Sequence, residues 1–266
     1  MNTFTTFRLI FEAALIAVAL SPLACWLARK FGLVDIPNSE PHKQHTGPMP
    51  VAGGVILFVT VIVVGLAEQS IEALSIRPIL LAATITFLFG LWDDYKGLSP
   101  LVKLVGQVLA ALLLIKLGVH VRLFVQDWPN WILTVLWVVG VTNAYNFVDS
   151  MDGLADGLAG LAFAFFMLAT IDSQQYYLSL FSTILLGACI GSFYFNSSPA
   201  RYFIGDSGSQ FLGFILAAIG IAYNPVGFSR FASWYVPILL MGVPLFDATL
   251  VIISRLLRGR PIYKAA

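Results

Sequence analysis

The chain has 266 residues, of which 59% are hydrophobic and 11% are charged, and its formal net charge is +1. Soluble globular domains carry roughly a quarter charged residues, so this composition and a mean hydropathy of +0.87 exclude that class and predict an integral membrane protein. Cys25 and Cys189 lie in separate apolar runs and indicate neither a disulfide framework nor a metal site. The expected partners include the lipid bilayer but no nucleic acid.

Nine apolar runs are long enough, or nearly so, to cross a hydrocarbon core as helices of about 20 residues. Open sheets leave backbone groups unpaired in lipid, so each run predicts a helix. No linker or shift in composition divides the chain, which predicts one all-α, polytopic membrane helix bundle over residues 1–266. The predicted spans are residues 7–28, 50–67, 74–92, 101–118, 131–148, 154–171, 176–195, 209–223 and 233–254.

The connections between the runs predict an orientation. Every second connection, beginning with the first, is rich in polar residues, whereas the others are short or bland. Because successive spans reverse direction, all the rich connections are expected on one face, where ten of the fifteen basic residues also fall. The positive-inside rule places that face in the cytoplasm and the N-terminus outside, as in a multi-pass plasma-membrane protein.

The first rich connection, residues 35–54, contains four prolines and three glycines, which predict ordered irregular chain rather than helix. Lys43 lies between His42 and His45, a cationic patch suited to binding a phosphate group. A zinc site would call for a nearby Cys or a third His, so zinc is the weaker interpretation. Gly53-Gly54 is expected to let the second span approach another backbone closely.

A carboxylate pair, Asp93-Asp94, closes the third predicted span. The pair could simply be solvated at a helix end, or it could belong to a site that handles a divalent metal or a phosphate. Lys103 lies close enough in sequence to pair with these carboxylates or to hold a phosphate.

The stretch between the fifth and sixth runs places polar residues at spacings of three or four. On a continuous helix, these residues would share one face. Carboxylates so close together repel unless a cation compensates them, and hard divalent cations prefer oxygen ligands. The alternative is a polar face that holds helices together within the bundle. The residues are Asn143, Asn146, Asp149, Asp152 and Asp156.

Two later features also allow two interpretations each. Gly205-Asp206-Ser207-Gly208-Ser209 could be an N-capped helix start, with Ser207 or Ser209 accepting from first-turn amides. The same residues could hold an anion on those amides and a metal on Asp206, and the two readings are compatible. Asp247, inside the ninth run, is a functional candidate by its location or a structural partner near a kink at Pro244.

Taken in order, these motifs resemble those of the polyprenyl-phosphate N-acetylhexosamine-1-phosphate transferase superfamily, glycosyltransferase family 4, over essentially the whole chain. This superfamily includes phospho-MurNAc-pentapeptide transferase. The first loop and the run from Asp247 to Arg260 look like the GlcNAc-1-phosphate transferase branch. The motifs are Asp93-Asp94, Asn143-x-x-Asn146-x-x-Asp149-x-x-Asp152-Gly153, Gly205-Asp206-x-Gly208-Ser209 and Pro244-x-x-Asp247.

The resemblance implies transfer of a sugar-1-phosphate, GlcNAc-1-phosphate above all, from a UDP-sugar to undecaprenyl phosphate with release of UMP. This would be the first membrane step of cell-wall or surface-polysaccharide synthesis. The implied cofactor is Mg²⁺, with Mn²⁺ as the alternative, and relatives suggest a homodimer. The implied metal ligands are Asp206, Asn146 and Asp149; the catalytic residues are Asp93, Asp94, Asp149 and Asp152; the substrate-binding residues are Lys43, Lys103, Asn143 and Asn146.

The sequence departs from the family pattern at two places. Ser150 stands where a glycine is usual, a change that the site should tolerate. The family continues past the stretch at Arg258-Gly-Arg260-Pro261 into a His-rich cytoplasmic loop, so we expect this chain, which stops at Ala266, to be truncated at its C-terminus.

Two other functions are compatible with acidic motifs in a membrane bundle. An intramembrane aromatic prenyltransferase would carry carboxylates at i and i+4 in two similar loops and would not need Gly205-Asp206-Ser207-Gly208-Ser209. A cation-coupled transporter would cluster carboxylates in mid-span, whereas only Asp247 falls clearly inside a predicted span.

Overall fold

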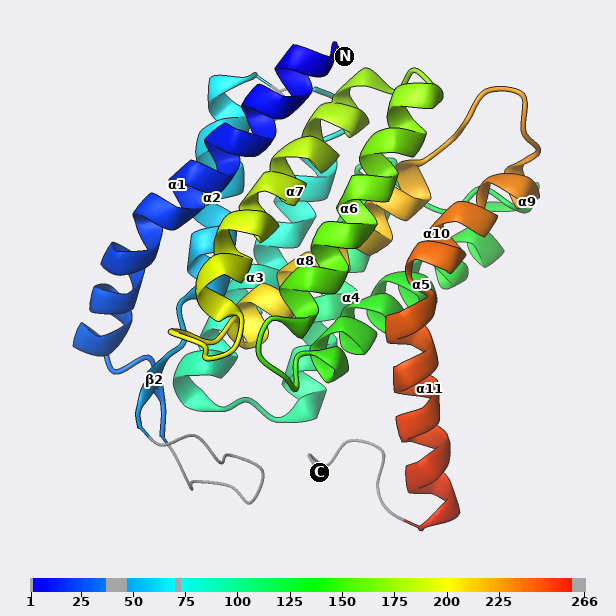
Figure 1. Ribbon diagram of the computed structural model, residues 1–266. Coiled ribbons are helices and arrows are strands. Elements are labelled where there is room, and N and C mark those ends of the chain that lie inside the picture. The colour runs from blue at the N-terminus through cyan, green and yellow to red at the C-terminus, as the bar shows by residue number, and fades with distance from the viewer. Residues whose placement is uncertain (1, 37–46, 70–72, 260–266) are drawn as a thin grey trace.

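The computed structural model describes residues 2–36, 47–69 and 73–259 and shows a helix bundle (Figure 1). The first half contains α1 (Thr3–Lys30), β1 (Val34–Asp35), β2 (Met49–Pro50), α2 (Gly53–Ala67), α3 (Arg77–Lys96), α4 (Pro100–Lys116) and α5 (Asp127–Val148). The second half contains α6 (Leu154–Asp172), α7 (Tyr176–Asn196), α8 (Gly205–Ala222), α9 (Arg230–Ser233), α10 (Tyr235–Leu240) and α11 (Gly242–Leu257).

The predicted multi-pass helical architecture holds, but the count of nine spans is not confirmed. Among the described helices, α1, α5, α6, α7 and α8 are long and apolar enough to cross a membrane, and a bent pair could supply a sixth span. Helices α2 and α4 have only 15 and 17 residues, and α3 ends in charged residues. Each of the first eight predicted runs nevertheless contains a helix.

The ninth predicted run is not one straight helix. The segment Arg230–Leu240 and helix α11 meet at a 71° bend. Pro244 lies in the first turn of α11, where its missing N–H removes no hydrogen bond within the helix. The sequence allowed a kink at Pro244 as one alternative; the chain instead bends at Met241, so α10 and α11 replace the predicted helix over 233–254.

Helix α8 forms the centre of the bundle. Every residue from Ser207 to Gly220 is buried, and the helix packs against α2, α3, α5 and α6 (Figure 1). A helix that is apolar around its whole circumference is stable only when neighbours cover all its sides. Helix α8 begins at Gly205 rather than near residue 209, so the Gly205–Ser209 motif forms its first turn.

Glycines bring the backbones of two helices into contact with this first turn. A Cβ on Gly54 of α2 would lie 2.5 Å from the amide nitrogen of Gly208, and one on Gly90 of α3 would lie 2.5 Å from the carbonyl oxygen of Asp206. Side-chain carbons do not approach backbone atoms so closely, so both positions require glycine. The expectation that the second span would approach another backbone is therefore confirmed.

A small sheet holds the segment that leads into α8, and the sequence did not predict it. Strands β1 and β2 pair antiparallel, and Val51 pairs with Phe203 in a parallel bridge. The amides of Ala52 and Gly53 both donate to the carbonyl oxygen of Phe203, each at 3.1 Å. The fold is thus helical with one two-stranded addition, which ties the end of the first loop to the start of α8.

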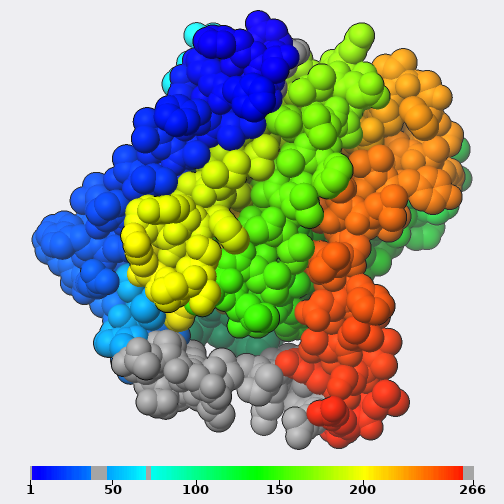
Figure 2. Space-filling view, in the orientation of Figure 1, coloured from blue at the N-terminus to red at the C-terminus, as the bar shows by residue number. Residues whose placement is uncertain are grey.

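The outer surface of the bundle is apolar, as a bilayer requires. Helices α1, α6 and α7 lie side by side on the face shown in Figure 2, and α11 projects beyond the body of the molecule. Along α1, Phe4, Phe7 and Phe11 are between 68% and 78% exposed. Such a row of exposed aromatic side chains would be a liability in water but is expected of a helix that faces lipid.

We expect Gly54→Ala to destabilise the protein by about 1–3 kcal/mol, because the new methyl group would overlap the backbone of the first turn of α8. Gly140→Ala is the matched control, since Gly140 is also helical and a Cβ there meets nothing within 4 Å. Thermal unfolding in detergent measures both. Equal melting temperatures for the two variants would contradict the close contact between α2 and α8.

Candidate active site

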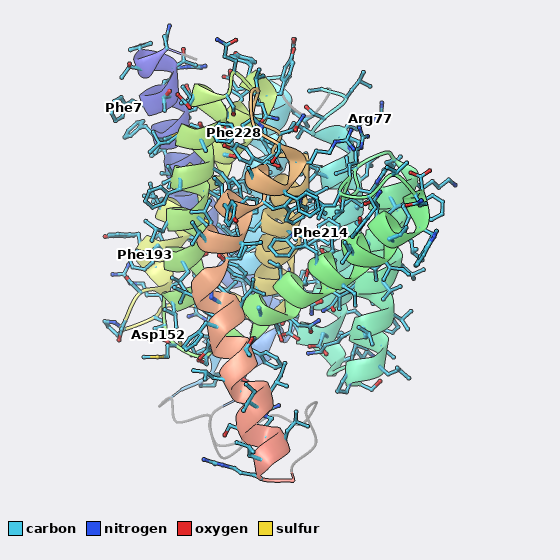
Figure 3. All side chains as sticks on the ribbon, turned by 90° about the vertical axis from the view of Figure 1, so that its right-hand side faces the viewer. Phe7, Arg77, Asp152, Phe193, Phe214 and Phe228 are labelled. Carbon is cyan, nitrogen blue, oxygen red and sulfur yellow. The ribbon has the colours of Figure 1, made fainter. Side chains whose placement is uncertain are left out.

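The structure gathers most of the predicted polar residues at one end of the bundle. They come from the end of α3, the start of α4, the end of α5 and the start of α8. Asp152 marks this end in Figure 3, whereas Arg77 and Phe228 lie at the opposite end. The residues brought together by direct contacts are Asp93, Asp94, Lys103, Asn146 and Asp206.

At the centre of this cluster, one ammonium group bridges two carboxylates. The Nζ of Lys103 contacts Oδ2 of Asp93 and Oδ2 of Asp206. The other oxygen of Asp206 accepts from Nδ2 of Asn146 at 2.7 Å. The three charged side chains are only 10–27% exposed, so water screens their attraction less than at an open surface. Pairing with the Asp93-Asp94 motif was one of the two roles that the sequence allowed for Lys103, and the structure shows it for Asp93.

Asp94 caps the first turn of α8 from a neighbouring helix. Its Oδ1 accepts from the amide of Asp206 at 2.7 Å, and its Oδ2 accepts from the amide of Ser207 at 3.0 Å. The prediction that Ser207 or Ser209 caps this helix is wrong, since the hydroxyl of Ser209 donates to the carbonyl oxygen of Gly205 instead. Asp94 thus satisfies amides that a helix start leaves unpaired.

Helix α5 ends before the acidic part of the central motif, so the five polar residues do not share one helical face. Asn146 lies in the last turn of α5, and Asp149 follows the last helical residue, Val148. Asp152 is exposed in the turn and accepts from the amide of Ala200 at 3.2 Å. Gly153, with φ of 74°, allows the chain to enter α6.

Asp149 lies in a region of concentrated negative charge. Burial, together with the carboxylates of Asp156, Asp206 and Asp94, raises the pKa of Asp149 well above its usual value. A neighbouring cation would favour the ionised carboxylate. The position is therefore electrostatically suited to a positive ligand.

Asn143 is engaged in an amide network inside the bundle. Its Nδ2 donates to Oε1 of Gln107 at 2.6 Å and to the carbonyl oxygen of Val139 at 2.8 Å. The Nε2 of Gln107 also reaches Oε1 of Gln210 at 3.3 Å. This network joins α4, α5 and α8, which fits the helix-holding alternative for Asn143. Gln107 and Gln210 were missed, although single amides within apolar runs were a usable signal.

Of the remaining candidate residues, those that the structure describes do not join the cluster. Lys43 lies outside the described residues, as do His42 and His45. Asp247 lies on the exposed side of α11 and makes no side-chain hydrogen bond or ion pair within the described part of the chain. Asp156 is buried in α6 and accepts from the hydroxyl of Ser192 at 2.6 Å.

The donor atoms of the cluster suit magnesium chemically. Within residues 2–36, 47–69 and 73–259, no three His, Cys, Asp or Glu side chains form a ready-made metal site. Asp93 and Asp206, however, already accommodate one positive charge between them, that of Lys103. Mg²⁺ is usually held by one or two carboxylates together with substrate phosphates rather than by an all-protein cage.

A sequence model of the glycosyl transferase family 4 matches residues 76–224, more than half of the chain. The chain belongs to glycosyl transferase family 4. The matched region contains every contact of the cluster described above. Membership of this family decides against the prenyltransferase and transporter interpretations.

Relatives in this family resemble the chain over most of its length. A probable undecaprenyl-phosphate N-acetylglucosaminyl 1-phosphate transferase of Bacillus subtilis is 32% identical over 260 residues, covering 93% of this chain and 71% of that protein. Phospho-N-acetylmuramoyl-pentapeptide-transferases of Bacillus cytotoxicus and Bacillus thuringiensis are 32% and 31% identical. Each of these two matches covers 79% of this chain and 72% of the relative.

We expect Asp94→Ala to lower the stability of this family 4 protein by about 1–3 kcal/mol, because two buried amides of α8 lose a charged acceptor. Asp152→Ala is the control, since it removes one hydrogen bond at an exposed position and should change stability by less than about 0.5 kcal/mol. Unfolding in detergent measures the stability of both variants. An equal loss of stability in Asp94→Ala and Asp152→Ala would argue against the capping role of Asp94.

Asp149→Asn should raise the melting temperature by a few degrees while impairing the site. The raised pKa of Asp149 means that the folded protein opposes its ionisation, so wild-type stability falls as pH rises above about 4, the unfolded value. Asparagine removes this penalty, so the gain should be absent below that pH and grow above it. Melting curves at several pH values provide the measurement, and a gain independent of pH would refute the electrostatic explanation.

Proposed function

We propose that this protein transfers GlcNAc-1-phosphate from UDP-GlcNAc to undecaprenyl phosphate and releases UMP. The observation that carries the proposal is the cluster of Asp93, Lys103 and Asp206, with Asn146, at one end of a membrane bundle. There, an acceptor phosphate anchored in the bilayer and a water-soluble donor can meet. The names of the relatives in family 4 support the same reaction class.

In the proposed reaction, an oxygen of the lipid phosphate attacks the β-phosphorus of the UDP-sugar. The new P–O bond forms as the bond between that phosphorus and the bridging oxygen breaks, and UMP leaves with the bridging oxygen. A phosphate monoester has a second pKa near ~6, so the acceptor is largely dianionic at neutral pH and needs little help from a base. The protein therefore acts mainly by positioning and by balancing charge.

The contacts suggest a separate task for each residue. Lys103 supplies the positive charge of the cluster to a phosphate, and Asp93 orients it through their ion pair. Asp94 supports the site indirectly by fixing the first turn of α8, and hence Asp206. These assignments revise the expectation that Asp93 and Asp94 are both catalytic residues.

The proposed cofactor is Mg²⁺, with Mn²⁺ as a substitute, held by Asp206 with Asn146 and Asp149. When bound, the ion would neutralise charge that builds up on the diphosphate during transfer. The hydrogen bond from Asn146 to Asp206 joins two of the proposed ligands. The high pKa of Asp149 agrees with a carboxylate placed to receive a cation.

The choice of GlcNAc over the MurNAc-pentapeptide rests on the extent of similarity. The match to the GlcNAc-named relative covers 93% of the chain, against 79% for the MurNAc-pentapeptide-named ones. We also propose that the site faces the cytoplasm, because the sequence predicts most of the basic residues on the same side.

Radiolabelled UDP-GlcNAc tests the proposal with the purified chain. Sugar label should enter the organic-extractable lipid only when undecaprenyl phosphate and Mg²⁺ are both present. UDP-MurNAc-pentapeptide as the donor should give little transfer. Failure of both donors would overturn the proposed function, and transfer from the pentapeptide donor alone would overturn the assignment of the sugar.

Asp206→Asn should reduce Mg²⁺-dependent transfer by about 10²–10³-fold, because one carboxylate charge at the centre of the cluster is lost. Asp172→Asn is the control, as Asp172 is exposed at the opposite end of the bundle. Initial rates and melting temperatures should be measured for both. Turnover like wild type in folded Asp206→Asn protein would remove Asp206 from the proposed metal site.

A further inference from the structure

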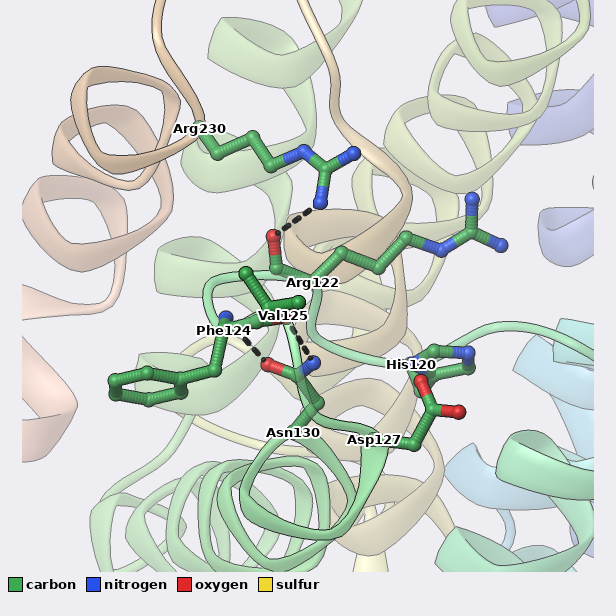
Figure 4. A pocket seen from close by; sticks show the side chains of 7 residues that line it. All are labelled: His120, Arg122, Phe124, Val125, Asp127, Asn130 and Arg230. Atoms are coloured by element: carbon green, nitrogen blue, oxygen red, sulfur yellow. Dashed lines mark hydrogen bonds between the residues drawn. The ribbon is translucent and has the colours of Figure 1, made fainter.

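An open cavity of about 450 Å³ lies at the end of the bundle opposite the candidate active site. It is formed by the loop after α4, the start of α5 and the start of α9 (Figure 4). Helix α5 has 22 residues, with Asp127 at the cavity and Asn146 at the cluster. At 1.5 Å per residue the helix is roughly 33 Å long, close to the thickness of a bilayer core. The cavity is therefore separate from the proposed transfer site.

The wall of the cavity is rigidly built around Asn130, which is 2% exposed. Its Oδ1 accepts from the amides of Leu123 and Phe124, both at 2.9 Å. Its Nδ2 donates to the carbonyl oxygen of Phe124 at 2.8 Å (Figure 4) and to that of Gln126 at 3.0 Å. The side-chain amide thus uses all four of its hydrogen-bonding positions on the loop that directly follows Arg122 in the chain.

Two arginines give the cavity an excess of positive charge. Arg230 donates to the carbonyl oxygen of Arg122 at 3.2 Å, and Arg122 donates to that of Gly118 at 3.2 Å. Each guanidinium has five N–H donors, and neither forms an ion pair with a carboxylate among the described residues. Among the described residues, Asp127 is the one acidic residue that lines the cavity, so two permanent cations face a single carboxylate there.

This arrangement suits a ligand with several anionic oxygens. Arginine binds phosphate groups through paired N–H donors, and most donors of Arg122 and Arg230 are uncommitted within the described residues. In Figure 4 both side chains extend toward the right of the view.

The surroundings of the cavity are apolar, which points to an amphiphilic ligand. Phe124 and Val125 line it, and Val125 is 96% exposed. On the loop before α9, Val226 and Phe228 are also highly exposed, and Phe228 lies at this end in Figure 3. Large apolar side chains on a membrane protein's end loops are expected to enter the lipid interface. A soluble anion would not make use of them.

We propose that this cavity binds the phosphodiester headgroup of an anionic phospholipid, with its acyl chains beside Phe124 and Val125. Arg122 and Arg230 hold the phosphate, and the apolar residues select a lipid over a free anion. The site is independent of the proposed transfer reaction, because no residue of the catalytic cluster takes part.

Binding of phosphatidylglycerol with a fluorescent tail, measured on delipidated protein in detergent, tests the proposal. The double variant Arg122→Gln/Arg230→Gln should bind it about tenfold more weakly than wild type. Phosphatidylcholine, which has the same phosphodiester but no net charge, should not displace it. A second variant, Arg122→Lys/Arg230→Lys, keeps both charges but loses the paired donors. Its affinity for phosphatidylglycerol should lie between those of wild type and the glutamine variant.

Lys116→Gln is the control, because it removes an exposed positive charge from the end of α4, outside the cavity lining. It should bind phosphatidylglycerol as wild type does. Equal affinities in wild type and in both arginine variants would overturn the proposal. Displacement by inorganic phosphate, with equal binding of the two lipids, would assign the cavity to a free anion and overturn the lipid assignment.

Discussion

The first turn of α8 is the constraint on which the rest of the site depends. It is enclosed by the backbones of α2 and α3 at Gly54 and Gly90, too close for any side chain between them. A buried helix start cannot leave its amides to water, and Asp94 supplies the missing acceptor from α3. The same contacts fix Asp206 between Lys103 and Asn146.

The second property of the site is an imbalance of charge. Among the described residues, Asp93 and Asp206 share the ammonium group of Lys103, and the carboxylate of Asp206 is close enough to Asp149 to raise the pKa of Asp149. Repulsion among these carboxylates lowers the stability of the fold unless a further cation binds. Proteins tolerate such a loss of stability mainly at functional sites. The nearby Asp156 is instead paired within the protein. Its buried carboxylate accepts a hydrogen bond from the hydroxyl of Ser192, which in turn accepts from the hydroxyl of Tyr202 at 3.0 Å. This chain of hydrogen bonds links α6 and α7 to the segment before α8.

Much of the site could be predicted because its chemistry is local in sequence. The spacing of Asn143, Asn146 and Asp149, and the pair at Asp93-Asp94 near Lys103, were visible without coordinates. Helix α5 nevertheless ends at Val148, and the sequence pattern did not indicate this end. The spacing of three continues through Asp152, and only Gly153 marks a break in the pattern. A cap donated from another helix, such as Asp94, leaves no local signature.

The fold was predictable to a similar extent. Apolar runs predicted the helices, but not the 71° bend near Met241 or the pairing of β1 with β2, whose strands have two residues each. The count of nine spans is not confirmed, because short helices such as α2, with 15 residues, fall below the length that a bilayer core requires. The bend and the strand pairing depend on contacts between segments that are distant in the sequence.

Labelling the β-phosphate of UDP-GlcNAc with ³²P tests the central claim most directly. If the protein transfers a sugar-1-phosphate, the broken bond lies between the two phosphates, and the label moves to the undecaprenyl lipid while unlabelled UMP is released. If it transferred the sugar alone, the label would remain on the nucleotide as UDP, and the proposed role of the cluster would be contradicted.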